Sequence, residues 1–219
     1  MKVSLFSKEK EEDVTVIQPP NYGWLDKKLS DPEMDYLWKC IENKKGSWKS
    51  TLAGNITNSY ELRDMGDWFW INTLKPLCNK YAKEFGNVGD KLPINQGHPY
   101  YLPSLWVNYQ KQYEFNPLHD HDGLYSFVVW MKVPTDYEDQ KNNAIALGVN
   151  SNAISNFQFN YINILGQPEG FTYCMSSKWE GHMIFFPAAL RHQVYPFYNC
   201  DEERISISGN IKINTSKIS

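Results

Sequence analysis

The stretch Asn116-Pro117-Leu118-His119-Asp120-His121-Asp122-Gly123 decides how the fold of this 219-residue chain is predicted. It carries two of the chain's five histidines and directly precedes a strongly apolar run. Successive side chains of an extended strand point to opposite faces, so His119 and His121 should share one face and Asp120 and Asp122 the other. Two imidazoles on one face can bind a transition metal if a further ligand comes from elsewhere. Asn-Pro and Asp-Gly are also turn signals, so an exposed turn is the alternative interpretation.

His192 is the best candidate for the third ligand. It follows the apolar segment 183–186 and a short turn, and it begins a strand that faces back into the sheet. A jelly roll would bring that strand beside the one that begins at His121. The two remaining histidines, His98 in a Gly-His-Pro loop and His182 at a strand entrance, are typical of surface positions.

Arg204 opens the last predicted strand, whose residues 205–213 alternate between isoleucines and polar side chains. Ser206 lies two residues on and therefore shares the face of Arg204. A polar face inside an apolar β-domain can be buried if it lines a wet cavity, where the planar guanidinium suits a carboxylate and the hydroxyl adds a hydrogen bond. An ordinary outward-facing polar side of a strand is the alternative.

The remaining pattern predicts helices first and strands afterwards. Ser30 and Glu33 form a capping signature for a helix that ends near Glu42, with Met34, Leu37, Trp38 and Ile41 as its apolar positions. A second helical stretch covers 60–85, with a kink or break at Pro76. Strands are expected at 105–113, 124–133, 157–164 and 183–186, and less clearly at 47–56, while 134–156 is a long polar excursion.

These elements predict an α+β chain that is mainly β, with a sandwich or jelly-roll barrel buttressed by the N-terminal helices. We expect an N-terminal lead-in over 1–23 and one domain over 24–219. The formal charge of −3 argues against nucleic acid or an anionic membrane as a partner, because both require a basic surplus. The charged N-terminus and the absence of a long apolar run predict a cytoplasmic protein. The four cysteines form no C-x-x-C pair, so we expect free thiols.

Together, His119-x-His121, His192 and Arg204-x-Ser206 resemble the 2-oxoglutarate/Fe(II)-dependent oxygenases. In that superfamily an H-x-D pair precedes a distal histidine, and an Arg-x-Ser follows it; the gaps here, 192 − 121 = 71 and 204 − 192 = 12, fit that order. Further stretches resemble a subgroup common in marine bacteria and their phages, which would set the protein in a bacterial or phage-infected cell; they are 52–56, 106–109, 121–130, 185–187 and 192–196.

The resemblance implies a double-stranded β-helix (jelly roll) that holds Fe(II) and uses 2-oxoglutarate and O₂. It implies that Arg204, assisted by Ser206, pairs with the distal carboxylate of 2-oxoglutarate. It also assigns a cosubstrate contact to Tyr109, ten residues before His119 (119 − 109 = 10). The implied activity couples oxidative decarboxylation of 2-oxoglutarate to hydroxylation or a related oxidation of another substrate.

One departure from the family pattern leaves the ligand set open, because His121 stands where the carboxylate is usual. The triad could consist of His119, His121 and His192. A local bulge could instead bring in Asp120 or Asp122. As a third possibility, His121 could be the first ligand, with a vacant carboxylate place at Gly123.

Two other functions compete with this interpretation. A cupin-like metalloenzyme would share the jelly roll and the histidines without needing 2-oxoglutarate, and a non-catalytic jelly-roll module would bind sugar or protein without any metal. The sequence selects neither a substrate, which could be a small molecule or a side chain, nor an oligomeric state. The excursion over 134–156 and the loops near Trp106 and Trp130 are the candidate mouths of the cavity.

Overall fold

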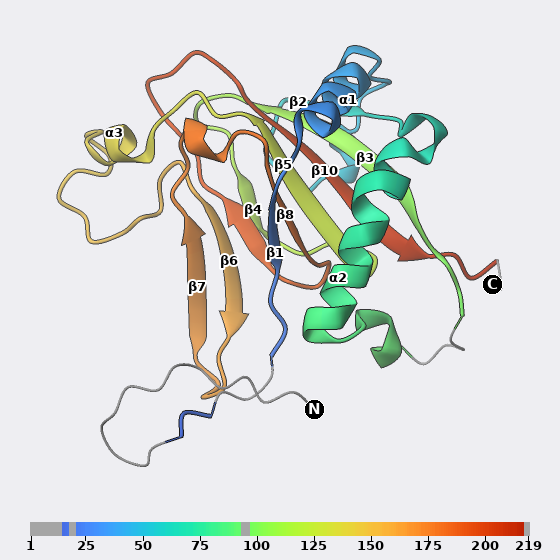
Figure 1. Ribbon diagram of the computed structural model, residues 1–219. Coiled ribbons are helices and arrows are strands. Elements are labelled where there is room, and N and C mark those ends of the chain that lie inside the picture. The colour runs from blue at the N-terminus through green and yellow to red at the C-terminus, as the bar shows by residue number, and fades with distance from the viewer. Residues whose placement is uncertain (1–14, 18–20, 93–96, 217–219) are drawn as a thin grey trace.

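Two antiparallel sheets form the body of the protein in a computed structural model, which describes residues 15–17, 21–92 and 97–216 (Figure 1). The larger sheet has the order β1-β8-β5-β10-β3-β2, with bounds Leu25–Lys28, His182–Pro187, Tyr125–Lys132, Arg204–Ile213, Tyr100–Gln110 and Asn58–Glu61. The smaller sheet has the order β4-β9-β6-β7, with bounds Asn116–His119, His192–Val194, Phe157–Ile162 and Pro168–Tyr173. The mainly β architecture predicted from the sequence is therefore confirmed.

Helices cover one face of the larger sheet, and α2 lies across it in Figure 1. The α-helices are α1 (Asp31–Glu42), α2 (Lys75–Phe85) and α3 (Tyr137–Lys141), and a π-helical turn, η3 (Trp70–Leu74), leads into α2. Short 3₁₀ turns are η1 (Lys49–Thr51), η2 (Met65–Asp67), η4 (Val88–Lys91) and η5 (Ser177–Trp179). Within the described ranges, no helix has both the length and the apolar character needed to cross a membrane.

Strand β5 is the centre of the larger sheet, as its continuous apolar run predicted. It pairs with β8 on one side and β10 on the other, and residues 125–131 are all buried. Tyr125, Phe127 and Val129 pack against the helices, while Val128 and Trp130 pack against Phe157 and its neighbours in the smaller sheet. A strand buried on both faces has no place for alternating polar residues, which explains its composition.

Strand β10 shows the opposite pattern, because its two faces meet different surroundings. Ile207 and Ile211 are completely buried in the core under the helices. The alternate residues Arg204, Ser206 and Ser208 line a cavity between the two sheets. The polar face of this strand is therefore enclosed rather than turned to solvent, as the cavity interpretation required.

Three predictions for the N-terminal half were wrong in detail. The helical stretch over 60–85 begins as strand β2, because residues 58–61 pair with β3, and its helical part starts only where the Asp64 carboxylate accepts the backbone N–H groups of Phe69 and Trp70. The strand over 47–56 consists only of two isolated bridges around η1. Trp38 is 36% exposed rather than part of the apolar face of α1. In the N-terminal lead-in, residues 1–14 and 18–20 lie outside the described residues.

The start of α1 agrees with its sequence signature and ties the helix to its surroundings. Glu33 accepts hydrogen bonds from the backbone N–H of Ser30 (2.8 Å), from Lys27 (2.7 Å) and from the Thr73 hydroxyl (2.7 Å). Burial by itself raises the pKa of the Glu33 carboxyl, but these hydrogen bonds outweigh it and lower the pKa to about 2. One buried carboxylate thus joins β1, α1 and η3.

We predict that Glu33→Gln lowers the free energy of unfolding at pH 7 by about 2 kcal/mol, the usual size for hydrogen bonds to a charged group. A lowered folded-state pKa stabilises the protein above the unfolded-state pKa, and this stability is lost as pH falls through the folded-state value. The difference between wild type and variant should therefore shrink from about pH 4.5 downward to about pH 2. Urea denaturation at several pH values measures it, and a difference that is independent of pH in this window would contradict the assignment.

Candidate active site

A cavity of about 530 Å³ lies between the sheets. Its floor is formed by the alternate residues of β3 and β10, from Ser104 to Gln110 and from Arg204 to Lys212. Neighbouring residues on the floor follow from the strand register, which sets Ser104 beside Asn210, Trp106 beside Ser208, Asn108 beside Ser206, and Gln110 beside Arg204. The opposite side carries the three predicted metal ligands.

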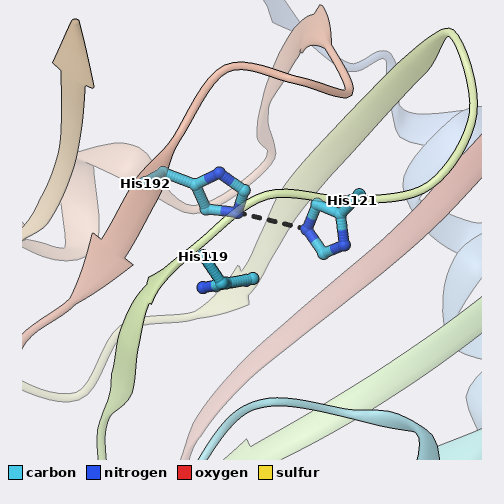
Figure 2. A group of neighbouring side chains, drawn as sticks. All are labelled: His119, His121 and His192. Atoms are coloured by element: carbon cyan, nitrogen blue, oxygen red, sulfur yellow. Dashed lines mark hydrogen bonds between the residues drawn. The ribbon is translucent and has the colours of Figure 1, made fainter.

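The three histidines come together although they lie far apart in the sequence. His119 ends β4 and His192 opens β9, and these two residues are direct partners in the strand register. His121 follows β4, and its backbone N–H donates to the Ala188 carbonyl at 3.0 Å. The three rings converge in Figure 2, and one ligand atom from each lies within 4.8 Å of the others. Fixed backbone pairing therefore assembles the cluster.

Two of the rings have their orientation set by backbone carbonyls. Nδ1 of His119 lies 2.7 Å from the Pro117 carbonyl oxygen, and Nδ1 of His192 lies 2.9 Å from that of Leu190. A carbonyl only accepts, so each Nδ1 carries the proton and each Nε2 presents a lone pair. The Nε2 atoms of His121 and His192 are 3.2 Å apart (Figure 2). Lone pairs that face a common point are the arrangement that a divalent cation requires.

The electrostatics of the cluster also favour a cation. Burial lowers the pKa of all three imidazoles, and their mutual repulsion lowers the pKa values of His121 and His192 further. The pKa of His121 falls to about 4. The rings are therefore neutral at physiological pH, and neutral imidazole is the form that binds metals. A transition metal fits this donor set.

The other candidate ligands are not part of the cluster. Asp120 and Asp122 are exposed at the edge of the cavity, and Asp122 lies 3.9 Å from the Lys212 ammonium. No bulge turns either carboxylate toward the histidines, because among the described residues only the three histidines form a metal-sized group. A side chain at Gly123, where φ is +109°, would point at the Ile211 carbonyl rather than toward the rings. His182 pairs with Asp26 instead.

Arg204 lies at one end of the cavity floor, beside Gln110, and is only 2% exposed. Its Nη2 donates to the carbonyl and the hydroxyl of Ser155 at 2.9 and 2.8 Å, and its Nη1 approaches Oε1 of Gln110 at 3.4 Å. The guanidinium lies 5.0 Å from the ring of Phe197. Burial lowers the pKa of Arg204 to about 10, so the group remains charged at neutral pH.

This cation has no anion of its own. Within the described residues no carboxylate pairs with Arg204, and its Nε is buried without a hydrogen-bond partner. A buried charge is costly unless it is paired. An unpaired guanidinium at the wall of a cavity, with the Ser206 hydroxyl on the same face, therefore fits an anionic ligand such as a carboxylate.

The prediction for Tyr109 was wrong about the face of β3. Tyr109 packs with Tyr60 against the core under the helices, on the side away from the cavity. The cavity side belongs to Asn108 and Gln110, which were not among the predicted site residues. Their signal was present, because both are polar residues that alternate with apolar ones in a strand. Asn108 has its orientation fixed by Ser59, whose hydroxyl donates to Oδ1 at 2.7 Å.

The walls of the cavity also differ from the expectation. Trp106 and Trp130 line it from within strands β3 and β5 rather than from loops at its mouth, and the excursion over 134–156 does not line it. The segment 48–56 takes that place, and it is held there by a bridge between Asn55 and Phe115. A short irregular segment with one 3₁₀ turn carries no periodic signal, so its place in the cavity wall does not follow from its sequence.

Comparison with known proteins agrees with this geometry. Residues 104–210 match the family described as "Putative 2OG-Fe(II) oxygenase". A prolyl-4-hydroxylase from Pseudomonas putida is similar in structure with a TM-score of 0.50, at 13% identity over 88% of this chain and 94% of its own. A viral collagen prolyl hydroxylase from Paramecium Bursaria Chlorella virus-1, solved with 2OG, has a TM-score of 0.49, at 15% identity over 87% and 94%. No protein with a curated function matches in sequence. The double-stranded β-helix expected from the sequence is confirmed.

The ligand set is tested by substitutions of the three histidines and of the two aspartates beside His121. We predict that His119→Ala, His121→Ala and His192→Ala each weaken binding of Mn(II) or Fe(II) by about a hundredfold or more, since groups that merely orient ligands already account for about 10- to 100-fold. Asp120→Asn and Asp122→Asn, on the neighbouring positions, should change the dissociation constant less than about threefold. Anaerobic calorimetry measures both sets. A large loss in either aspartate variant would restore the carboxylate alternative.

Proposed function

We propose that the cavity holds Fe(II) on His119, His121 and His192 and binds 2-oxoglutarate through Arg204, because residues 104–210 match the family described as "Putative 2OG-Fe(II) oxygenase". The enzyme couples oxidative decarboxylation of 2-oxoglutarate to oxidation of a second, organic substrate. One observation carries the proposal: three converging neutral imidazoles and a buried, unpaired guanidinium line the same cavity. Neither feature alone distinguishes this chemistry from that of a simpler metal-binding jelly roll.

The three histidines would hold the metal, which would bind O₂ and supply the redox chemistry of the reaction. Three protein ligands would leave further coordination positions available to the cosubstrate and to O₂. The carbonyls of Pro117 and Leu190 hold two of the rings in the ligating tautomer, so little reorganisation accompanies binding. The apolar neighbours Phe157 and Phe186 lie against His192 and exclude water from that side.

Arg204, Ser206 and Gln110 form the subsite for the distal carboxylate of 2-oxoglutarate. Arg204 and Ser208 are four residues apart, about 13 Å along an extended strand. Ser208 is the register partner of Trp106, whose ring centroid lies 5.9 Å from that of His121. In this proposal 2-oxoglutarate lies along the polar face of β10, with its distal carboxylate at the guanidinium and its keto acid end directed to the histidines.

The charge balance makes the cosubstrate important for this ligand set. A triad of neutral histidines leaves both positive charges of the ion uncompensated, unlike two histidines and a carboxylate. The 2-oxoglutarate dianion compensates the ion at one end and Arg204 at the other. The oxidised substrate then occupies the remaining space, lined by Ser104, Asn210, Lys212 and the segment 48–56. The four free cysteines favour a reducing compartment, and we assign the protein to the cytoplasm.

The experiment that tests the function is anaerobic addition of Fe(II) and 2-oxoglutarate to the full chain. We expect the weak visible charge-transfer band of the metal chelate, followed by succinate formation when air is admitted. A cupin-like enzyme would bind metal without the band, and a non-catalytic module would show neither response. Protein that binds Fe(II) but forms neither the band nor succinate would overturn the proposal.

The role of Arg204 is tested by comparison with Tyr109 on the other face of the floor. We predict that Arg204→Gln weakens 2-oxoglutarate binding by about a hundredfold, because a charge-assisted pair of carboxylate and guanidinium is worth about 3 kcal/mol when partly buried. Tyr109→Phe should leave the affinity unchanged, since its ring faces the core under the helices. Titration of the Mn(II)-loaded protein under argon measures both. Equal effects of the two substitutions would contradict the assignment.

A further inference from the structure

Ser155 ends the excursion between β5 and β6 in a backbone conformation that is unusual for a residue with a side chain. Its φ is +55°, in the left-handed region, and its side chain is completely buried. Such a conformation is unfavourable for serine and persists where surrounding contacts determine it. Here the Ser155 N–H donates to the Pro196 carbonyl at 2.8 Å, and its hydroxyl lies 3.1 Å from that of Thr135.

The strained residue faces Arg204 with two acceptors at once. Its carbonyl oxygen and its hydroxyl oxygen both accept from Nη2, at 2.9 and 2.8 Å. Nη2 has two hydrogens, so Ser155 satisfies this nitrogen completely. Phe197 lies against the guanidinium and limits its tilt. The position and plane of the charged group are therefore fixed before any ligand arrives.

What remains of the guanidinium defines how an anion can be bound. Nε has no partner, and Nη1 makes only the long 3.4 Å approach to Gln110. Ser155 thus leaves Nη1 and Nε, rather than Nη2, for a ligand carboxylate, and the Ser206 hydroxyl on the same face of β10 would assist. Without Ser155 the guanidinium could rotate toward the cavity or away from it, and the ligand would have to order it on binding.

Building on the proposed function, we infer that Ser155 is a positioning residue for 2-oxoglutarate: it holds Nη2 of Arg204 so that the rest of the guanidinium is ready for the distal carboxylate. The excursion over 134–156 thus has a role in orienting Arg204, although this segment does not line the cavity. The excursion is tied down independently by Gln140, whose side chain makes two hydrogen bonds of 2.8 Å with the backbone of Tyr198. Ser155, near the end of the excursion, then affects binding of the cosubstrate by holding Arg204.

The test is binding of 2-oxoglutarate to the Mn(II)-loaded full chain, measured by anaerobic calorimetry. Ser155→Ala, which removes the hydroxyl and keeps the carbonyl, should weaken the affinity by about tenfold. Ser155→Gly removes the same hydroxyl and suits a positive φ, so it should fold at least as well and show a similar loss. Mn(II) affinity should stay unchanged in both. In turnover, the KM for 2-oxoglutarate should rise by the same factor while kcat at saturation stays within about twofold.

Two controls separate positioning from general loosening. Ser151→Ala alters an exposed serine of the same excursion, whose hydroxyl accepts only from Ala153 among the described contacts. Gln140→Ala releases the excursion from Tyr198 without touching Arg204. Both should bind 2-oxoglutarate as wild type does, even if Gln140→Ala lowers the melting temperature.

The outcomes distinguish this inference from the function on which it rests. If wild-type protein binds no 2-oxoglutarate, or if Arg204→Gln binds it equally well, the proposed function fails. If Arg204→Gln loses binding while Ser155→Ala and Ser155→Gly retain wild-type affinity, only the positioning role is overturned. A loss in Gln140→Ala as large as that in Ser155→Ala would also overturn it, because the effect would then reflect a loosened excursion.

Discussion

The two-sided character of β10 is the constraint on which the rest of the structure depends. Ile207 and Ile211 must be removed from water, and they are, under the helices. The same strand carries polar groups at every alternate position, and its central place between β5 and β3 prevents it from turning them outward. Polar groups in such a place need partners. The cavity is the physical consequence of a central strand whose second face cannot be packed with apolar side chains.

The histidine cluster depends on a second constraint, which is the pairing of β4 with β9. The register that sets His119 opposite His192 belongs to the smaller sheet, whereas Arg204 belongs to the larger one. The site is therefore assembled across the two layers. Packing of Trp130 and Phe186 on Phe157 and Phe159 fixes the distance between those layers. The packing that stabilises the two sheets against each other therefore also determines the geometry of the site.

Sequence reasoning succeeded where periodicity and burial agree. The continuous apolar run at β5, the alternation at β10 and the same-face relation of His119 and His121 follow from a period of two and needed no tertiary information. It failed for Tyr109, which was taken from the family resemblance although the polar residues Asn108 and Gln110 mark the other face of β3 as the cavity side. It also failed where irregular backbone takes its position from distant contacts. The segment 48–56 is such a case, because backbone contacts with Ser59 in β2 and with Phe115 set its position beside the cavity.

The proposed three-histidine ligand set has a consequence for how metal and cosubstrate depend on each other. Neutral ligands offer the ion geometry but no charge, and Arg204 at the other end of the floor adds another positive charge to the same cavity. Each cation therefore raises the affinity for a dianion that reaches both, and the dianion must raise the affinity for the metal by the same factor, because coupling between binding sites is reciprocal. A carboxylate in the position of His121 would weaken that coupling. With an imidazole at this position, the cosubstrate compensates charge of the metal ion that a protein carboxylate would otherwise compensate.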